Sequence, residues 1–279
     1  PERAKGERVM MKHLGFSAAT AGFTSTEEAF RFASELGFDF IELNYDTCDF
    51  LPTVQPAKSV NELIRHTGIF VTVHLPFVDT NIASLMPTIR RASVEQTLRG
   101  LEYAHAVNAS CAVLHTGKIF IYQPVPFTTA YDALHLSLAE LESSVPIALE
   151  NLALYPDGLV REPDMLRDFT RAAGLHNCLD FGHAHIETWQ GWRDESVRGE
   201  DLIQKYIDVL GRGILHLHLC NNNGKDDLHT ATDKGTIPFE RYASFLGDFT
   251  GTVCLEIAGG QEQVRRSAEH IRSLVAVPI

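Results

Sequence analysis

The chain has 279 residues, of which 44% are hydrophobic, and a formal net charge of −12 at neutral pH. A chain of this length and composition can bury the core of one large domain. The acidic balance argues against a generally basic surface for nucleic acid, and no apolar stretch is long enough to cross a membrane.

Short apolar runs of β type alternate with amphipathic helical runs along the sequence. Residues 1–10 lack an apolar pattern, so we expect an N-terminal extension there and one barrel domain over residues 11–279. Start signals such as Ser25 and stop signals such as Gly37 delimit several predicted helices. The predicted strands lie near residues 12–16, 38–44, 69–74, 111–115, 146–150, 177–180, 214–220 and 252–257. The predicted helices lie near residues 25–36, 57–67, 88–107, 128–143, 161–173, 200–211, 238–247 and 261–274.

The alternation of strands and helices predicts the fold class. Strands that are separated by helices pair in parallel, and eight such units fit a closed barrel. An open doubly wound sheet would carry a glycine-rich phosphate-binding turn after its first strand, and the segment SAATAGFTS lacks that pattern. The sequence therefore predicts a single-domain (β/α)8 TIM barrel.

Six consecutive predicted strands end, or nearly end, on a residue that can bind a metal ion. The carboxyl ends of parallel strands lie together at one mouth of a barrel, where barrel enzymes build their active sites. These residues are therefore expected to share one pocket. They are His74, His115, Glu150, Asp180, His218 and Glu256.

Three further residues extend this set. His183 follows Asp180 by three positions, and the loop after the seventh strand contains Asp227-Leu-His229. Asp226 competes with Asp227, and His216 competes with His218, which is favoured because it lies closer to the strand end. Nine nitrogen and oxygen ligands exceed the needs of one ion and suit two or three Zn²⁺ or Mn²⁺ ions. Glu150, central in strand order, is the best candidate for a bridging ligand.

The five cysteines show no paired spacing. Four of them lie in predicted strands, where a thiol acts as a small apolar side chain. We therefore expect no disulfides and a cytoplasmic location. The four are Cys111, Cys178, Cys220 and Cys254.

Several stretches of the chain have the pattern of a known family. They are His74-Leu-Pro-Phe77 with Asn81-Ile-Ala-Ser84, Asp180-Phe-Gly-His183, His218-Leu and Asp227-Leu-His229. Through them the chain resembles the endonuclease IV and xylose isomerase-like TIM barrel superfamily, also called AP endonuclease family 2, and the resemblance covers nearly the whole chain. One departure is that the family's glycine pattern after the last histidine reads Asp233-Lys-Gly235 here.

The two branches of this superfamily imply different metal loads. Resemblance to endonuclease IV implies three zinc ions. The first would be held by His74, His115 and Glu150. The second would be held by Glu150, Asp180, His218 and Glu256, and the third by His183, Asp227 and His229. Resemblance to the sugar isomerases and epimerases implies one divalent ion on Glu150, Asp180, His218 and Glu256. In that branch Glu150 and Glu256 are also the catalytic pair that moves a proton beside a carbonyl.

Three hypotheses follow. The residues His74, His115, Asp227 and His229 favour a metal-dependent hydrolase of phosphoester bonds, because a one-ion epimerase has no metal for them to bind. The alternative is a divalent-metal-dependent sugar or sugar-phosphate isomerase or epimerase. A barrel that binds metal without catalysis is the third class.

Residues around the predicted pocket bear on the substrate. Phe77 stands where the family uses an aromatic wedge, and it is expected either to contact substrate or to pack over the rim. Trp189 and Trp192 either cover the pocket or pack on the rim, and Lys118 is a further candidate for substrate binding.

The loop after the second strand contains Asp46 and Asp49 and has no Lys or Arg. A protein that binds damaged DNA through the phosphate backbone of the DNA would need more positive charge around its site. A small phosphorylated or sugar substrate needs less, so both kinds of substrate stay open, and no membrane partner is expected.

Overall fold

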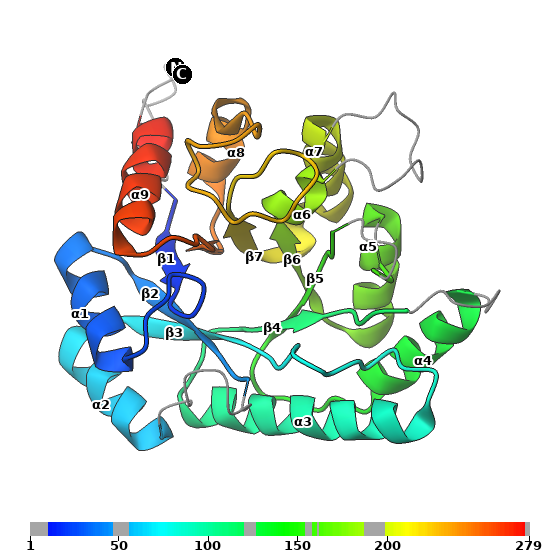
Figure 1. Ribbon diagram of the computed structural model, residues 1–279. Helices are drawn as coiled ribbons and strands as arrows, with labels where there is room; N and C mark the ends of the chain where they lie inside the picture. The colour runs from blue at the N-terminus through cyan, green and yellow to red at the C-terminus, as the bar shows by residue number, and fades with distance from the viewer. Residues whose placement is uncertain are drawn as a thin grey trace, which may run out of the picture.

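Eight parallel strands form a closed barrel in which each strand pairs with the next and β8 pairs with β1. The computed structural model describes residues 11–46, 56–119, 127–153, 158–160, 162–186 and 199–276. Helices surround the ring of strands (Figure 1), so the predicted (β/α)8 TIM barrel is confirmed. The strands are β1 (His13–Ser17), β2 (Phe40–Asn44), β3 (Phe70–His74), β4 (Ala112–His115), β5 (Ile147–Glu150), β6 (His176–Asp180), β7 (Ile214–Leu219) and β8 (Thr252–Leu255).

The helices begin and end largely where sequence signals predict. The Ser25 side chain accepts a hydrogen bond from the Glu28 amide at the start of α1, and Gly37 ends that helix in the left-handed conformation. None of the described helices combines the length and apolarity needed to cross a bilayer. The helices are α1 (Thr26–Leu36), α2 (Ala57–Thr67), α3 (Pro87–Ala106), α4 (Phe127–Ala139), α5 (Pro163–Ala173), α6 (Phe181–His185), α7 (Gly199–Leu210), η1 (Gly211–Gly213), η2 (Phe239–Tyr242), α8 (Ala243–Asp248) and α9 (Gln261–Ala276).

Three elements differ from the prediction. Helix α4 ends at Ala139 rather than near residue 143, and the Ser143 hydroxyl hydrogen-bonds both main-chain groups of Val145 in a local turn that competes with a helix. The helix expected over 238–247 is a 3₁₀ turn, η2, followed by α8. The short helix α6 directly after β6 was not predicted, since five residues are too few for a periodic pattern.

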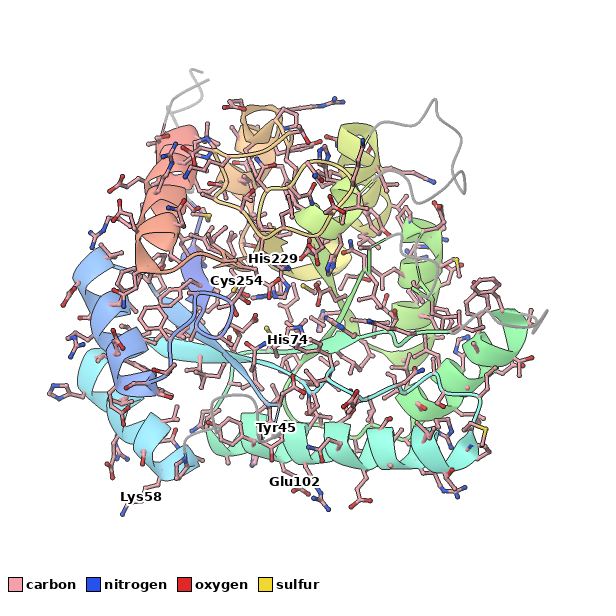
Figure 2. All side chains as sticks on the ribbon, viewed as in Figure 1. Tyr45, Lys58, His74, Glu102, His229 and Cys254 are labelled. Carbon is pink, nitrogen blue, oxygen red and sulfur yellow. The ribbon has the colours of Figure 1, made fainter. Side chains whose placement is uncertain are left out.

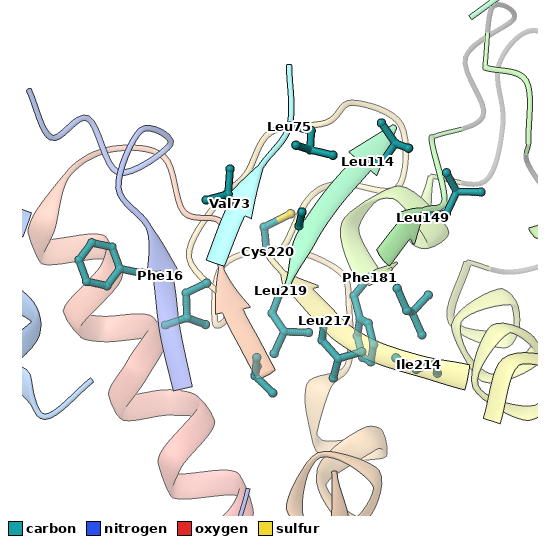
Figure 3. Close-up of a cluster of buried hydrophobic side chains, with 14 of the residues drawn as sticks. Phe16, Val73, Leu75, Leu114, Leu149, Phe181, Ile214, Leu217, Leu219 and Cys220 are labelled. Atoms are coloured by element: carbon teal, nitrogen blue, oxygen red, sulfur yellow. The ribbon is translucent and has the colours of Figure 1, made fainter. Parts of the chain in front are cut away.

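The core lies between the strands and the surrounding helices. Strand residues alternate in direction, so aliphatic side chains such as Val73, Leu149 and Leu217 point outward into this layer (Figure 3). The interior of the barrel is different. Its small apolar cluster consists of Val113, Ala148 and Cys178, and polar side chains fill much of the remaining interior. The barrel therefore encloses buried polar groups at its centre.

Candidate metal centre

Strand register brings the predicted ligands to one rim. His115 of β4 pairs directly with Glu150 of β5, and Asp180 of β6 pairs with His218 of β7. Glu256 follows the last residue of β8. Figure 2 shows His74 and His229 near the centre of the barrel, whereas Lys58 lies on an outer helix. The six strand-end side chains therefore surround one space.

Glu150 joins the inner ligands. Its Oε2 lies 3.2 Å from His115 Nε2 and 3.5 Å from His74 Nε2. Its other oxygen, Oε1, lies 3.2 Å from His218 Nδ1 and 3.3 Å from His183 Nδ1. One carboxylate thus faces two groups of ligands. The ligand atoms of His74, His115 and Glu150 lie within 4.8 Å of one another, as do those of Glu150, Asp180, His218 and Glu256.

The outer ligands gather on Asp227. Its Oδ2 lies 3.3 Å from His183 Nε2 and 3.3 Å from His229 Nε2. Main-chain carbonyl groups fix the orientation of both histidine rings. Nδ1 of His183 donates a hydrogen bond to Asn151 O, and Nδ1 of His229 donates one to Glu256 O. This arrangement leaves both Nε2 atoms for a ligand. His229 has a φ of 47°, a strained conformation typical of functional positions.

Local structure explains how His183 and Asp227 reach the site. The Asp180 side chain caps α6 by accepting a hydrogen bond from the His183 amide at 2.6 Å, so the helix begins at the strand end and turns His183 toward Glu150. A bridge between Asn221 and Thr230 closes the loop that carries Asp227. Its neighbour Asp226 is exposed and accepts a hydrogen bond from Asn223 instead.

The electrostatics fit divalent cations. Glu150 Oε2 and Asp180 Oδ2 are among the buried polar atoms of the described residues that form no hydrogen bond. Burial raises the pKa of Asp180 to about 6, although His183 opposes the shift. Burial lowers the pKa of His74, but the combined effect of the nearby carboxylates Glu150, Glu42 and Glu256 outweighs burial and raises the pKa to about 9. Protons on histidines thus balance the carboxylates, and cations can replace those protons.

Sequence reasoning missed Glu42. This fully buried carboxylate of β2 lies 3.2 Å from Nε2 of His218 and 3.2 Å from Nε2 of His216. Thr72 donates a further hydrogen bond to it. His216 therefore belongs to a layer below the predicted ligands, while His218 presents Nδ1 to them. The available signal was the carboxylate in the middle of the strand sequence FIELN.

Of the predicted substrate-binding residues, Phe77 and Lys118 belong to the described part of the chain, and both lie beside the candidate metal ligands. The Phe77 ring lies 5.1 Å from the His74 ring and 5.0 Å from the His115 ring, and the side chain is 38% exposed. Asp46 holds the Phe77 loop by accepting hydrogen bonds from the amides of Phe77 and Val78. Lys118 lines a cavity with Phe77 and His115. Trp189, Trp192 and Asp49 lie outside the described residues.

Fold and site define a (β/α)8 barrel with a cluster of candidate metal ligands at its carboxyl-terminal mouth. The chain belongs to the xylose isomerase-like TIM barrel family, which it matches over residues 30–274. An uncharacterised protein of Methanocaldococcus jannaschii is 28% identical over 203 residues, covering 70% of this chain and 73% of that protein.

Solved structures with this fold include an epimerase-like protein and an endonuclease. A D-tagatose 3-epimerase-like protein has a TM-score of 0.77 and 24% identity, covering 94% of this chain and 97% of its own. Endonuclease IV from Thermus thermophilus has a TM-score of 0.69 and 17% identity, covering 94% of this chain and 98% of its own. At these identities the likeness establishes the fold, and the reaction has to be argued from the site.

Proposed function

We propose that the chain is a metal-dependent hydrolase of phosphoester bonds that uses two or three divalent ions, with zinc as the first candidate. One observation carries the proposal. His183 and His229 both face Asp227, at 3.3 Å each, and none of these three residues is among the four that suffice for one ion. His74 and His115 add further nitrogen ligands on Glu150 Oε2. Clusters of nitrogen and carboxylate ligands of this size suit several zinc or manganese ions.

In this proposal the residues around the phosphoester have different roles. When bound, the cations supply positive charge for the anionic substrate and make water a stronger acid near neutral pH. Glu150 and Glu256 both face Nδ1 of His218, at 3.2 and 3.4 Å. They are the carboxylates at the reaction centre that can accept the proton of the attacking water. Phe77 and Lys118 lie on one side of this centre, where they can contact the substrate.

The charge of the chain favours a small phosphoester over long DNA. The net charge is −12, and Asp46 is used to hold the Phe77 loop. Tracking a DNA backbone requires many basic side chains. A short substrate that places one phosphate on the cluster needs few.

Adjacent aspartates provide a matched test. We expect the metal-reconstituted protein to hydrolyse bis(p-nitrophenyl) phosphate, and Asp227→Asn to reduce the rate roughly 100-fold. Asp226→Asn removes an exposed carboxylate from the same loop and should leave the rate unchanged. An oligonucleotide with one abasic site tests the DNA substrate in parallel. Equal effects of the two variants, or no hydrolysis of either probe at full metal load, would overturn the proposal.

A sugar or sugar-phosphate epimerase is the second candidate. The four ligands of a single-ion site, Glu150, Asp180, His218 and Glu256, are complete and buried. The two glutamates lie beside the same imidazole, as a proton-shuttling pair would. This function predicts exchange of a substrate C–H proton with deuterated water in a panel of ketoses and ketose phosphates, and Asp227→Asn should then leave the exchange unchanged.

A further inference from the structure

Exposed apolar side chains gather where the loop after β3 enters α3. Phe77 and Leu85 are each 38% exposed, Ile89 is 49% exposed and Met86 is 59% exposed. These are four of the six large apolar side chains that are exposed in the described part of the chain. Scattered exposed apolar residues are ordinary, whereas a contiguous group marks a place where something binds.

The four side chains line one concave space. This cavity, which we call the Phe77–Ile89 cavity, has a volume of about 440 Å³. Polar groups, including Asn81, Ser84 and Lys118, complete its wall. A mostly apolar concavity of this size with a few polar groups is typical of a site for a small molecule. A contact surface for a folded protein would be flatter and wider.

The cavity adjoins the metal centre. A smaller cavity of about 20 Å³ is lined by the candidate ligand His115 and shares Phe77, Thr80 and Lys118 with the larger one. The Phe77 ring contacts both His74 and His115. Phe77 therefore stands between the ligands and the apolar wall, and one molecule can reach both.

Hydrogen bonds hold the wall in shape. The Asn81 side chain donates to Lys118 O at 2.7 Å and accepts from the amides of Lys118 and Ala83, both at 3.1 Å. Ser137 of α4 donates to Ile82 O at 2.6 Å. Gly117 has a φ of 87°, and a side chain there would meet Asn81 Oδ1. The loop is thus tied to the loop after β4 and to α4, while its apolar side chains stay exposed.

We propose that the Phe77–Ile89 cavity binds an apolar arm, aromatic or alkyl, of a substrate whose phosphate lies on the metal cluster. The inference rests on the proposed function and specifies its substrate class as phosphoesters with one hydrophobic substituent. Burying that substituent against Leu85, Met86 and Ile89 removes apolar surface from water on both partners. The polar groups of the wall then remain for the part of the substrate nearest the phosphate.

Two phosphonates test the proposal without requiring turnover. Phenylphosphonate and methylphosphonate carry the same anionic group and differ in the apolar arm. We expect calorimetry on the metal-loaded protein to show phenylphosphonate binding roughly ten-fold more tightly. In the double variant Met86→Ser with Ile89→Ser, that advantage should fall below about three-fold, while the metal content stays unchanged.

Leu136→Ser is the matched control. Leu136 of α4 is 60% exposed, as Met86 is 59% exposed, and it does not line the cavity. This variant should keep the full preference for phenylphosphonate. Because all three residues are exposed, the variants should fold.

Each other result has a distinct meaning. Equal binding of the two phosphonates by the wild-type protein overturns the proposal and leaves hydrolysis standing. No binding of either phosphonate at full metal load removes the proposed function and this inference together. Light scattering gives one more outcome. If the double variant had half the mass of the wild-type protein, the apolar residues of the Phe77–Ile89 cavity would form a dimer interface, and this would also overturn the proposal.

Discussion

The buried carboxylate of Glu42 offers the sharpest test of how the site is organised. It contacts Nε2 of His218 at 3.2 Å, so that Nδ1 of the same ring points toward Glu150. Glu42→Gln keeps the size of the side chain and removes the charge that holds this orientation. A carboxylate behind a histidine ligand typically contributes about 10–100-fold to metal affinity, which corresponds to about 1.4–2.7 kcal/mol.

The assay is competition with a chelator for zinc, measured at one pH for both proteins. We expect Glu42→Gln to weaken zinc binding by that factor. Thr72→Val is the graded control, because it removes one hydrogen bond to Glu42 but keeps the carboxylate, and its effect should stay below about three-fold. Wild-type zinc affinity in Glu42→Gln would refute the reasoning. Lower stability of the metal-free variant with unchanged affinity would restrict Glu42 to a role in folding.

Two further predictions concern the site. The pKa of His74, lowered by burial but raised by Glu150 to a net value of about 9, is higher than in the unfolded chain. Its stabilisation of the metal-free protein, about 3 kcal/mol, is therefore complete below pH 6.5 and lost as the pH rises through 9. An unchanged melting temperature between pH 6 and pH 9.5 would contradict this. Gly182→Ala would press a methyl group against Cys220 Sγ and toward Asp180 Oδ1, so we expect about 1–3 kcal/mol of destabilisation in denaturant titrations and weaker metal binding. A variant with wild-type stability would show that this space can adapt.

Much of the fold could be predicted from the sequence because its signals are local and repeated. Continuous apolar strands alternate with amphipathic helices, and residues such as Ser25 and Gly37 mark helix ends in both sequence and structure. The barrel then brings strand ends together whatever the details of their register. For this reason nine dispersed side chains could be predicted to meet, although their role as metal ligands stays a prediction.

The remaining features depend on three-dimensional contacts that no local pattern encodes. Glu42 lies inside an apolar strand, and its contact with His218 exists only because the closed barrel brings β7 within reach of β2. The choice of Asp227 over Asp226 depends on how the loop closes, which the bridge between Asn221 and Thr230 determines. The Phe77–Ile89 cavity is formed mostly by residues of the loop between β3 and α3, where apolar periodicity carries no information.

The central claim is that the ligands on Asp227 hold an ion in addition to those on Glu150. The most direct test is elemental analysis of metal per chain in the purified protein, wild type and Asp227→Asn. The account predicts two or three ions per wild-type chain and one fewer in the variant. One ion in both proteins would contradict it and would favour the single-ion epimerase.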